Sequence, residues 1–313
     1  MAVGSSSTPR TILTSTNGFD WQLLESSEQR GLSDIGYGNG RFVAVGENNR
    51  SANRPGIVSS TDGLKWTPVD LVLENALFLQ AICFGNGRFI AVGVGFDAEG
   101  MTPAMISSSD GMNWNYRQLE FPNNGLDDVT YGQDRFVAVG GGGAFFDFSS
   151  TTSTIVTSTD GINWTSQESG ATSWLKNVAY GNGRFVATGS HGALLSSTDG
   201  VKWRRHNLDA LNLGSRPWAN ALSFCNGYFV AAGSLGGIIQ SGNIINLSLA
   251  PAADGGQLKL SLAGSKGLEY GIEASTNLVQ WRNLTNISST QPTNLVFEAL
   301  PVPGPVFFRA VAR

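Results

Sequence analysis

Residues 37–46 read YGNGRFVAVG, and this stretch occurs five times in the chain with small changes. Each copy has one aromatic anchor, and the anchors recur every 44 to 49 residues at Tyr37, Phe84, Tyr131, Tyr180 and Phe224. The GNG triplet predicts a tight hairpin, because glycine accepts positive φ without a Cβ penalty. The aromatic and β-branched residues that follow predict a strand. A motif repeated at this period indicates a fold built from equivalent units.

A second motif, S-x-D-G-x-x-W, alternates with the first. The Asp carboxylate can accept hydrogen bonds from backbone N–H groups of its own turn, and the Trp can cover the turn while its N–H finds a carbonyl. An active site needs one copy, whereas a fold-forming turn needs one per unit, so we interpret these residues as structural. They are Asp62, Trp66, Asp110, Trp114, Asp160, Trp164, Asp199 and Trp203; the first copy has Asn17 before Trp21. The same reasoning assigns a structural role to Arg41, Arg88, Arg135 and Arg184, which follow the first hairpin.

Each repeat predicts four short antiparallel strands, which is the signature of a propeller blade. We therefore predict an all-β fold, a six-bladed β-propeller over 1–250. Four complete blades are expected at 31–73, 79–121, 126–171 and 175–213, and a further one at 219–249. The opening MAVG aligns with FVAVG, so the first blade is incomplete. Either the sequence is an N-terminally truncated fragment or this blade takes its inner strand from elsewhere.

The S-x-D-G-x-x-W turns resemble the Asp-box of neuraminidase-like (BNR) repeat propellers of the secreted bacterial type. In that family the box is S-x-D-x-G-x-x-W, so the turn here is one residue shorter. The resemblance covers the first 250 residues and implies a sialidase-like fold, carbohydrate binding and an extracellular or cell-surface location. It does not carry sialidase activity, because no arginine-centred segment matches and Tyr37, Tyr131 and Tyr180 are repeat positions expected in the core.

The repeat disappears in residues 251–313. Alternating strands separated by turn signals predict a small β-sandwich, which resembles immunoglobulin- or fibronectin-III-like modules. The stretch ASTNLVQW around Trp281 is similar to a blade turn, so a divergent seventh blade is the alternative.

Composition excludes several classes of function. The net charge is −4 and only 14% of the 313 residues are charged, which argues against nucleic acid as a partner. The sequence contains no apolar run of eighteen residues, so no membrane span is predicted, and no secretory signal is visible. His191 and His206 lack ligand-spaced neighbours and no phosphate or dinucleotide motif occurs, so neither a metal nor a cofactor is expected. We interpret Cys83 and Cys225 as small buried apolar residues without a disulfide.

Candidate binding residues are those that break the repeat in the variable loops between second and third strands and between blades. Trp174 and Trp218 share one repeat position, six residues before the anchor, where Gly31 and Gly125 occur elsewhere; it should lie near the mouth of the central channel. Aromatic rings beside polar groups suit sugars through stacking and hydrogen bonds. The other candidates are Phe96, Phe145, Phe146, Arg50 and His191.

Carboxylates in the same loops are the alternative catalytic candidates: Asp97, Glu99 and Asp147. Asp127 and Asp128 are adjacent, and neighbouring residues of a regular strand point to opposite faces. We therefore predict a non-catalytic extracellular binding or scaffold propeller that recognises a glycan or a protein through its variable-loop face. The alternatives are a glycoside hydrolase or polysaccharide lyase using loop carboxylates, and an assembly factor for a protein complex. The sequence does not indicate an oligomeric state.

Overall fold

The computed structural model describes residues 1–4, 11–25, 31–49, 54–71, 76–97, 100–119, 125–141, 153–181, 183–206, 219–225, 228–233, 238–241, 245–251, 258–263, 269–277, 279–288, 294–299 and 307–312. The chain forms two compact units, Met1–His206 and Asn207–Arg313. All described elements are β-strands apart from one 3-10 turn at Ser190–Gly192. The all-β prediction is therefore confirmed, and no helix in the described residues is long and apolar enough to cross a membrane.

The N-terminal unit is a series of antiparallel sheets whose strands follow one another in chain order. The first sheet has three strands, β1 (Ala2–Gly4), β2 (Thr11–Thr14) and β3 (Gln22–Glu25). Four sheets of four strands follow: β4 (Leu32–Gly38), β5 (Arg41–Asn49), β6 (Arg54–Ser60) and β7 (Thr67–Pro68); β8 (Ala76–Gly85), β9 (Arg88–Asp97), β10 (Gly100–Ser108) and β11 (Asn115–Gln118); β12 (Gly125–Gly132), β13 (Arg135–Gly141), β14 (Ser153–Ser158) and β15 (Thr165–Gln167); and β16 (Leu175–Gly181), β17 (Arg184–Gly189), β18 (Leu194–Ser197) and β19 (Arg204–Arg205).

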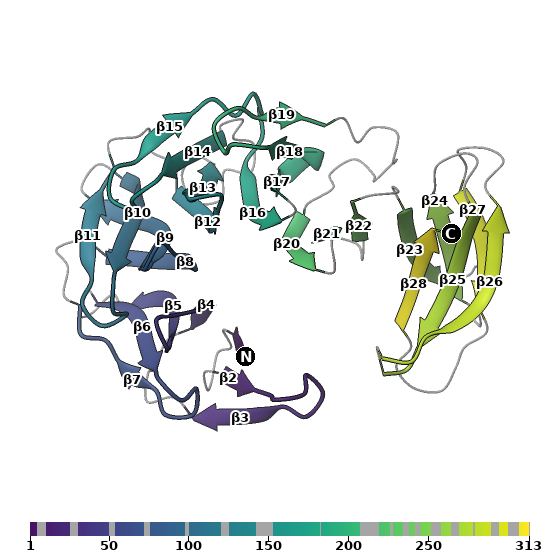
Figure 1. Cartoon of the computed structure of the whole chain (residues 1–313), viewed down its shortest axis with the longest axis horizontal. Helices are drawn as coiled ribbons and strands as arrows, with labels where there is room; N and C mark the ends of the chain where they lie inside the picture. Colours follow the sequence, from purple (N-terminus) through teal and green to yellow (C-terminus); the bar gives the residue numbers. More distant parts are fainter. Residues whose placement is uncertain are drawn as a thin grey trace. The chain divides into compact units, whose positions relative to one another are not determined.

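Within this unit the first strand of each four-stranded sheet lies innermost and the fourth lies at the outside (Figure 1). We call β4, β8, β12 and β16 the inner strands; β4 contacts β8, β8 contacts β12, and β12 contacts β16. Hydrophobic cores fill the space between neighbouring sheets. One cluster joins Val43 and Ile57 of one sheet to Leu79 and Ile106 of the next, and all four side chains are essentially inaccessible to solvent.

In three sheets the glycine after the aromatic anchor packs against the anchor ring of the following sheet. A Cβ on this glycine would lie 2.0–2.1 Å from the Cγ atom of the next aromatic ring; the pairs are Gly38 with Phe84, Gly85 with Tyr131, and Gly132 with Tyr180. Tyr37 differs, since its side chain is 58% exposed. The expectation that Tyr37 is a core residue is therefore wrong: among the described residues, β1–β3 provide no inner strand that could present such a glycine to it.

The GNG hairpins turn through two consecutive residues of positive φ, as in Asn86 (45°) and Gly87 (70°). This is the type I′ geometry, whose twist matches the flanking strands. Two of these asparagine side chains also reach the next sheet: Asn39 Nδ2 donates to the Ser109 carbonyl at 3.0 Å, and Asn86 Nδ2 donates to the Thr159 carbonyl at 3.2 Å. One dipeptide therefore forms the hairpin and joins two sheets.

The S-x-D-G-x-x-W turns share one hydrogen-bond pattern. In the third copy, Asp110 Oδ1 accepts bonds from the Ser108 hydroxyl and from the backbone N–H groups of Met112 and Asn113. These bonds hold the pKa of Asp110 well below its usual range. The same pattern recurs at Asp62, Asp160, Asp199 and Asn17.

The tryptophans of these turns fall into two groups. Trp21, Trp66 and Trp203 donate their indole N–H to the carbonyl of the turn glycine at 2.9–3.3 Å. The Nε1 atoms of Trp114 and Trp164 are buried and have no hydrogen-bond partner among the described residues.

The C-terminal unit contains two antiparallel sheets. The first has the order β20 (Ala219–Cys225), β21 (Tyr228–Gly233), β22 (Ile238–Gln240), β23 (Ile245–Pro251), β24 (Leu258–Ala263) and β27 (Asn294–Ala299). The second has the order β26 (Arg282–Ser288), β25 (Glu269–Ser275) and β28 (Phe307–Ala312). The unit begins at Asn207, so it includes the last repeat as well as the segment after residue 250.

Both cysteines are free thiols. Cys83 is partly buried in β8, whereas Cys225 is exposed at the end of β20, so the expectation that both are buried is wrong for Cys225.

Candidate functional site

Every inner strand carries a β-bulge near its start. The register shifts by one residue between Leu32 and Asp34 in β4, and the equivalent shifts occur in β8, β12, β16 and also in β20. A bulge places two residues of one strand opposite a single partner and redirects their side chains. Regular alternation therefore fails at this position of each repeat.

The expectation that Asp127 and Asp128 point to opposite faces is wrong for this reason. The bulge in β12 lies between Leu126 and Asp128, so Asp127 is the additional residue. Both carboxylates reach the same neighbouring strand: Asp127 accepts hydrogen bonds from Trp174 and Lys176, and Asp128 accepts one from the Val178 N–H of β16.

Asp127 holds Trp174 and Lys176, which flank the start of the next inner strand. Trp174 Nε1 donates to Asp127 Oδ2 at 2.6 Å, and Lys176 Nζ donates to Asp127 Oδ1 at 2.8 Å. The Lys176 ammonium also lies 3.4 Å from the centre of the Trp174 ring, within cation–π range. Burial raises the pKa of the Asp127 carboxyl, and Lys176 and Trp174 offset part of that effect. We call these three residues the Trp174 cluster.

Two other aspartates join neighbouring inner strands. Asp34 accepts bonds from its own neighbour Ile35 and from the Ile82 N–H of β8 at 2.8 Å. Asp128 does the same with Val129 and with Val178 of β16, at 2.7 Å each. Each carboxylate thus supplies an acceptor to a backbone N–H of the adjacent sheet.

Burial dominates the electrostatics of these aspartates. It raises the pKa of Asp34, and it raises the pKa of Asp128 to about 7, with the charges of Asp34 and Asp127 adding to the rise. The Cys83 thiol belongs to the same environment. Burial raises its pKa well above the usual value, with contributions from Asp128 and Asp34, so Cys83 is a neutral thiol rather than a nucleophilic thiolate at neutral pH.

Among the predicted binding residues, Trp174 belongs to the Trp174 cluster. Its backbone also makes the same close contact as the residues at the equivalent position of the other repeats. The carbonyl oxygens of Gly31, Phe78, Gly125 and Trp174 all lie 1.9–2.0 Å from where a Cβ would lie on the second-strand glycine nine residues after the aromatic anchor of the same repeat. Phe96 packs edge-on against Phe78, with ring centres 5.6 Å apart. His191 is exposed in the 3-10 turn, in a left-handed conformation with φ of 54°.

The side chains of the remaining candidate residues lie outside the part of the chain that the structure describes. Asp97 ends β9, but its side chain is outside the described part. Arg50, Glu99, Phe145, Phe146, Asp147 and Trp218 lie outside the described residues altogether. In the part of the chain that is described, no group of three or more His, Cys, Asp or Glu side chains could hold a metal ion.

Sequence reasoning missed Asp127 and Lys176 as partners of Trp174. A signal was present, because Asp127 and Lys176 occupy the bulge position, which is Ser33 and Gln80 in the two preceding complete repeats. Opposite charges at the same position of consecutive repeats meet if the inner strands are neighbours. The bulge itself has no distinct sequence signature here.

No protein-family model matches the sequence, and no curated protein matches it either. Solved structures do match. The periplasmic gluconolactonase PpgL of Pseudomonas aeruginosa superimposes with a TM-score of 0.53 at 10% identity, covering 96% of this chain and 98% of that one. A GH32 β-fructofuranosidase of Bombyx mori gives a TM-score of 0.41 at 13% identity, covering 78% and 69% of the two chains. The sialidase of Trypanosoma rangeli gives 0.42 at 13% identity, covering 80% and 55%.

These neighbours are β-propellers, and the match to the gluconolactonase supports the same fold for this chain. At 10% identity the likeness extends to the fold alone.

Proposed function

We propose that the protein is a non-catalytic binding propeller that recognises a glycan near Trp174, on the face that carries the variable loops. The observation that carries this proposal is the Trp174 cluster. An aromatic ring is fixed by a hydrogen bond at its N–H and by an ammonium over its ring, and both contacts come from neighbouring inner strands.

This arrangement suits a sugar for two physical reasons. A ring held in advance loses little freedom when a ligand stacks on it, which favours affinity. The Lys176 ammonium has three N–H donors, of which Asp127 takes one, and its side chain is 28% exposed. Lys176 can therefore donate to a ligand hydroxyl at the edge of the indole.

The described inner-strand carboxylates favour binding over catalysis. Both oxygens of Asp34, Asp127 and Asp128 accept hydrogen bonds from the protein itself. A general acid or base must reach the proton that it transfers, and these groups are already engaged. A hydrolase or lyase would need the loop carboxylates Asp97, Glu99 or Asp147 instead.

We also propose the finer architecture that the repeats indicate. The chain would be a six-bladed Asp-box-like propeller over 1–250, with a small β-sandwich over 251–313 in an extracellular or cell-surface protein. The pairing of β24 with β27 in one sheet and of β25 with β28 in another supports a sandwich over a seventh blade, whose strands would pair in chain order. The turn at Ser275–Gln280 has the hydrogen-bond pattern of the blade turns, which is the feature that favours the alternative.

The test is glycan-array binding of the full chain, followed by Trp174→Ala and Trp218→Ala. Trp174→Phe keeps an aromatic ring but removes the donor to Asp127, so it separates stacking from positioning. Trp21→Ala is the matched control, because Trp21 is a blade-turn tryptophan that is 46% exposed. We expect both alanine variants to abolish binding while the melting temperature stays near that of the parent.

Three results would redirect the proposal. Unchanged binding by Trp174→Ala refutes the site. Turnover of a polysaccharide that is lost in Asp97→Asn, Glu99→Gln or Asp147→Asn replaces binding with hydrolysis or lysis. Absence of any glycan binding, together with capture of a defined protein complex from the native host, favours the assembly-factor alternative.

A further inference from the structure

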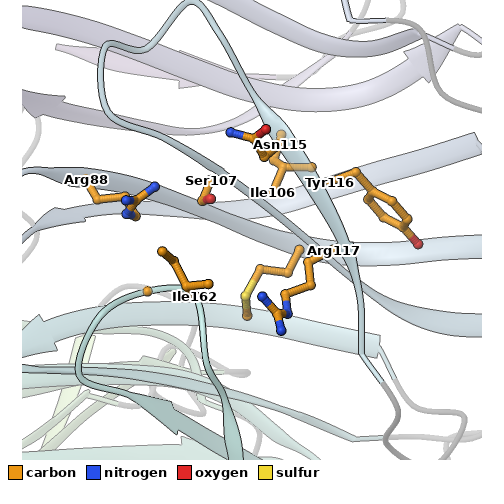
Figure 2. Close-up of a pocket in the computed structure, with 9 residues that line it drawn as sticks. Arg88, Ile106, Ser107, Asn115, Tyr116, Arg117 and Ile162 are labelled. Carbon is orange, nitrogen blue, oxygen red and sulfur yellow. The ribbon is translucent and has the colours of Figure 1, made fainter.

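A groove of about 200 Å³ lies between the β8–β11 sheet and the S-x-D-G-x-x-W turn of the following sheet (Figure 2). Its walls come from β9, β10 and β11 on one side and from Gly161 and Ile162 on the other. Across β10 and β11, Met105 is opposite Arg117 and Ser107 is opposite Asn115, so these four side chains share one face of the sheet. Arg88 lines the same groove from the start of β9.

The charge of the groove is one-sided. Arg88 and Arg117 are both among the lining residues, and none of the nine lining residues carries a carboxylate. Two guanidinium groups on one concave surface attract an anion, and each presents donors in a fork that matches a carboxylate or a sulfate.

Arg88 differs from two of its three equivalents in the described repeats, Arg41 and Arg184, and resembles the third, Arg135, which also forms no hydrogen bond to the opposite residue of the third strand. Arg41 donates to Ser59 at 2.9 Å and Arg184 donates to Ser196 at 3.4 Å, in each case to the serine opposite on the third strand. Ser107 is the matching serine for Arg88, but the two form no hydrogen bond in the described structure, and both line the groove. Arg88 and Ser107 therefore keep their hydrogen-bonding groups unengaged by each other at the edge of a ligand-sized space.

We propose that this groove binds a single sugar residue that carries a carboxylate or a sulfate ester. The two guanidinium groups take the anionic group. The Ser107 hydroxyl and the Asn115 amide provide neutral polar contacts for ring hydroxyls, and Ile162, which is 40% exposed, forms an apolar wall for the ring face. The volume is below the roughly 300 Å³ at which drug-sized pockets begin, which limits the occupant to about one ring.

This site is independent of the Trp174 cluster. Its residues belong to the second, third and fourth strands of one sheet and to the aspartate turn of the next, whereas the cluster lies at the starts of the inner strands. Binding at either site can therefore be lost without the other.

The experiment is a calorimetric titration of the full chain with glucuronate, glucose 6-sulfate, glucose and inorganic sulfate, each at low and at physiological salt. The test variants are Arg88→Gln and Arg117→Gln. Glutamine keeps the stem of the side chain, which matters at Arg88 because its Cδ packs close to Gly161. Arg41→Gln is the matched control, since Arg41 holds the same repeat position but is bonded to Ser59.

We expect at least one charged sugar to bind, with glucose at least about tenfold weaker and with affinity falling as salt rises. Arg88→Gln and Arg117→Gln should each raise the Kd about tenfold, and Arg41→Gln should leave it unchanged. Glucuronate binding without glucose 6-sulfate binding, or the reverse, identifies the anionic group.

The proposal is overturned if neither charged sugar binds, if glucose binds as tightly, or if Arg41→Gln weakens binding as much as Arg88→Gln does. Equal affinity for inorganic sulfate and for the charged sugar refutes the sugar subsite and leaves an adventitious ion only. Arg117→Gln stays informative if Arg88→Gln fails to fold, because Arg117 lies on the outermost strand of the sheet.

Discussion

Gly85→Ala tests the central claim about how the sheets fit together. Gly85 ends the inner strand β8, and a Cβ at this position would lie 2.0 Å from Tyr131 Cγ and 2.5 Å from both Cδ atoms. Ordinary van der Waals contact begins near 3.4 Å, so the ring must move by roughly 1.4 Å. The φ of Gly85 is not positive, so alanine has no conformational penalty there and the destabilising part of the effect is steric.

The size of the effect follows from what Tyr131 touches. Its ring packs on Phe136 at 4.6 Å between centres and borders the hydrophobic core between the two sheets. Overpacking a filled core costs about 1–3 kcal/mol, and a rigid aromatic ring pushed as a body belongs at the upper end. Alanine regains about 0.5 kcal/mol relative to glycine in a strand. We expect Gly85→Ala to lower the free energy of unfolding by about 2–3 kcal/mol.

The assay is urea denaturation followed by tryptophan fluorescence, with two controls. Gly87→Ala has no atom within 4 Å of its new Cβ but has φ of 70°, so it should cost only about 1 kcal/mol. In the Tyr131→Ala background the ring is absent, and there Gly85→Ala should be neutral or slightly stabilising. A Gly85→Ala loss no greater than that of Gly87→Ala, or one that persists without the Tyr131 ring, would refute the reasoning.

Three further predictions concern the aspartates. The folded pKa of Asp128 is about 7, which is above its unfolded value, so the folded state binds a proton that the unfolded state has already lost. The free energy of unfolding should therefore fall by up to about 3 kcal/mol as pH rises from about 4 to 7. Denaturation across this range should give a flatter pH profile for Asp128→Asn than for the parent. Asp110→Ala should lower the free energy of unfolding by about 1 kcal/mol in the same assay at neutral pH. Asp110→Asn should be nearly neutral, because Asn17 accepts the same two backbone bonds in the first repeat. Equal losses in the two variants would contradict the hydrogen-bond explanation. Lys176→Met should cost about 2 kcal/mol at pH 7 by leaving Asp127 without its counterion, and adding Asp127→Asn should recover part of that loss, so an additive double variant would show that the pair is not coupled.

The repeat motifs predicted the parts of the fold that depend on local chemistry. The positive φ values at Asn86 and Gly87, and the Asp110 turn bonded to its own backbone, follow from residue types within a few positions of one another. The alternating strands expected within residues 251–313 are present as β24 to β28, because they too depend on local residue patterns. Contacts between repeats were harder to predict. The local sequence of the YGNG motif does not indicate that its first glycine packs against an aromatic ring 46 residues later in the chain, as Gly85 does against Tyr131.

The site was less predictable than the fold because it depends on a bulge. A regular strand would separate Asp127 from Asp128, and the alternation rule gave that answer. Because β12 has an extra residue, the alternation rule does not apply at this position, and Asp127 contacts Trp174 and Lys176. The candidate site therefore joins Asp127 to residues 47 and 49 positions later in the chain. Trp174 itself was predictable, because a large aromatic replaces glycine at a repeat position.

Repetition shows that a position is structural, but it does not show that every copy is only structural. The arginine after each hairpin was interpreted as structural from its recurrence, and Arg41 and Arg184 agree with that interpretation through their serine partners. Arg88 and Arg135 form no such bond in the described part of the chain, and Arg88 lines a groove together with Arg117. Because the scaffold repeats, a residue whose contacts differ from those of an equivalent residue can be tested against that residue within one chain. Arg88 and Arg41 are such a pair, and we expect their glutamine variants to have opposite effects on binding.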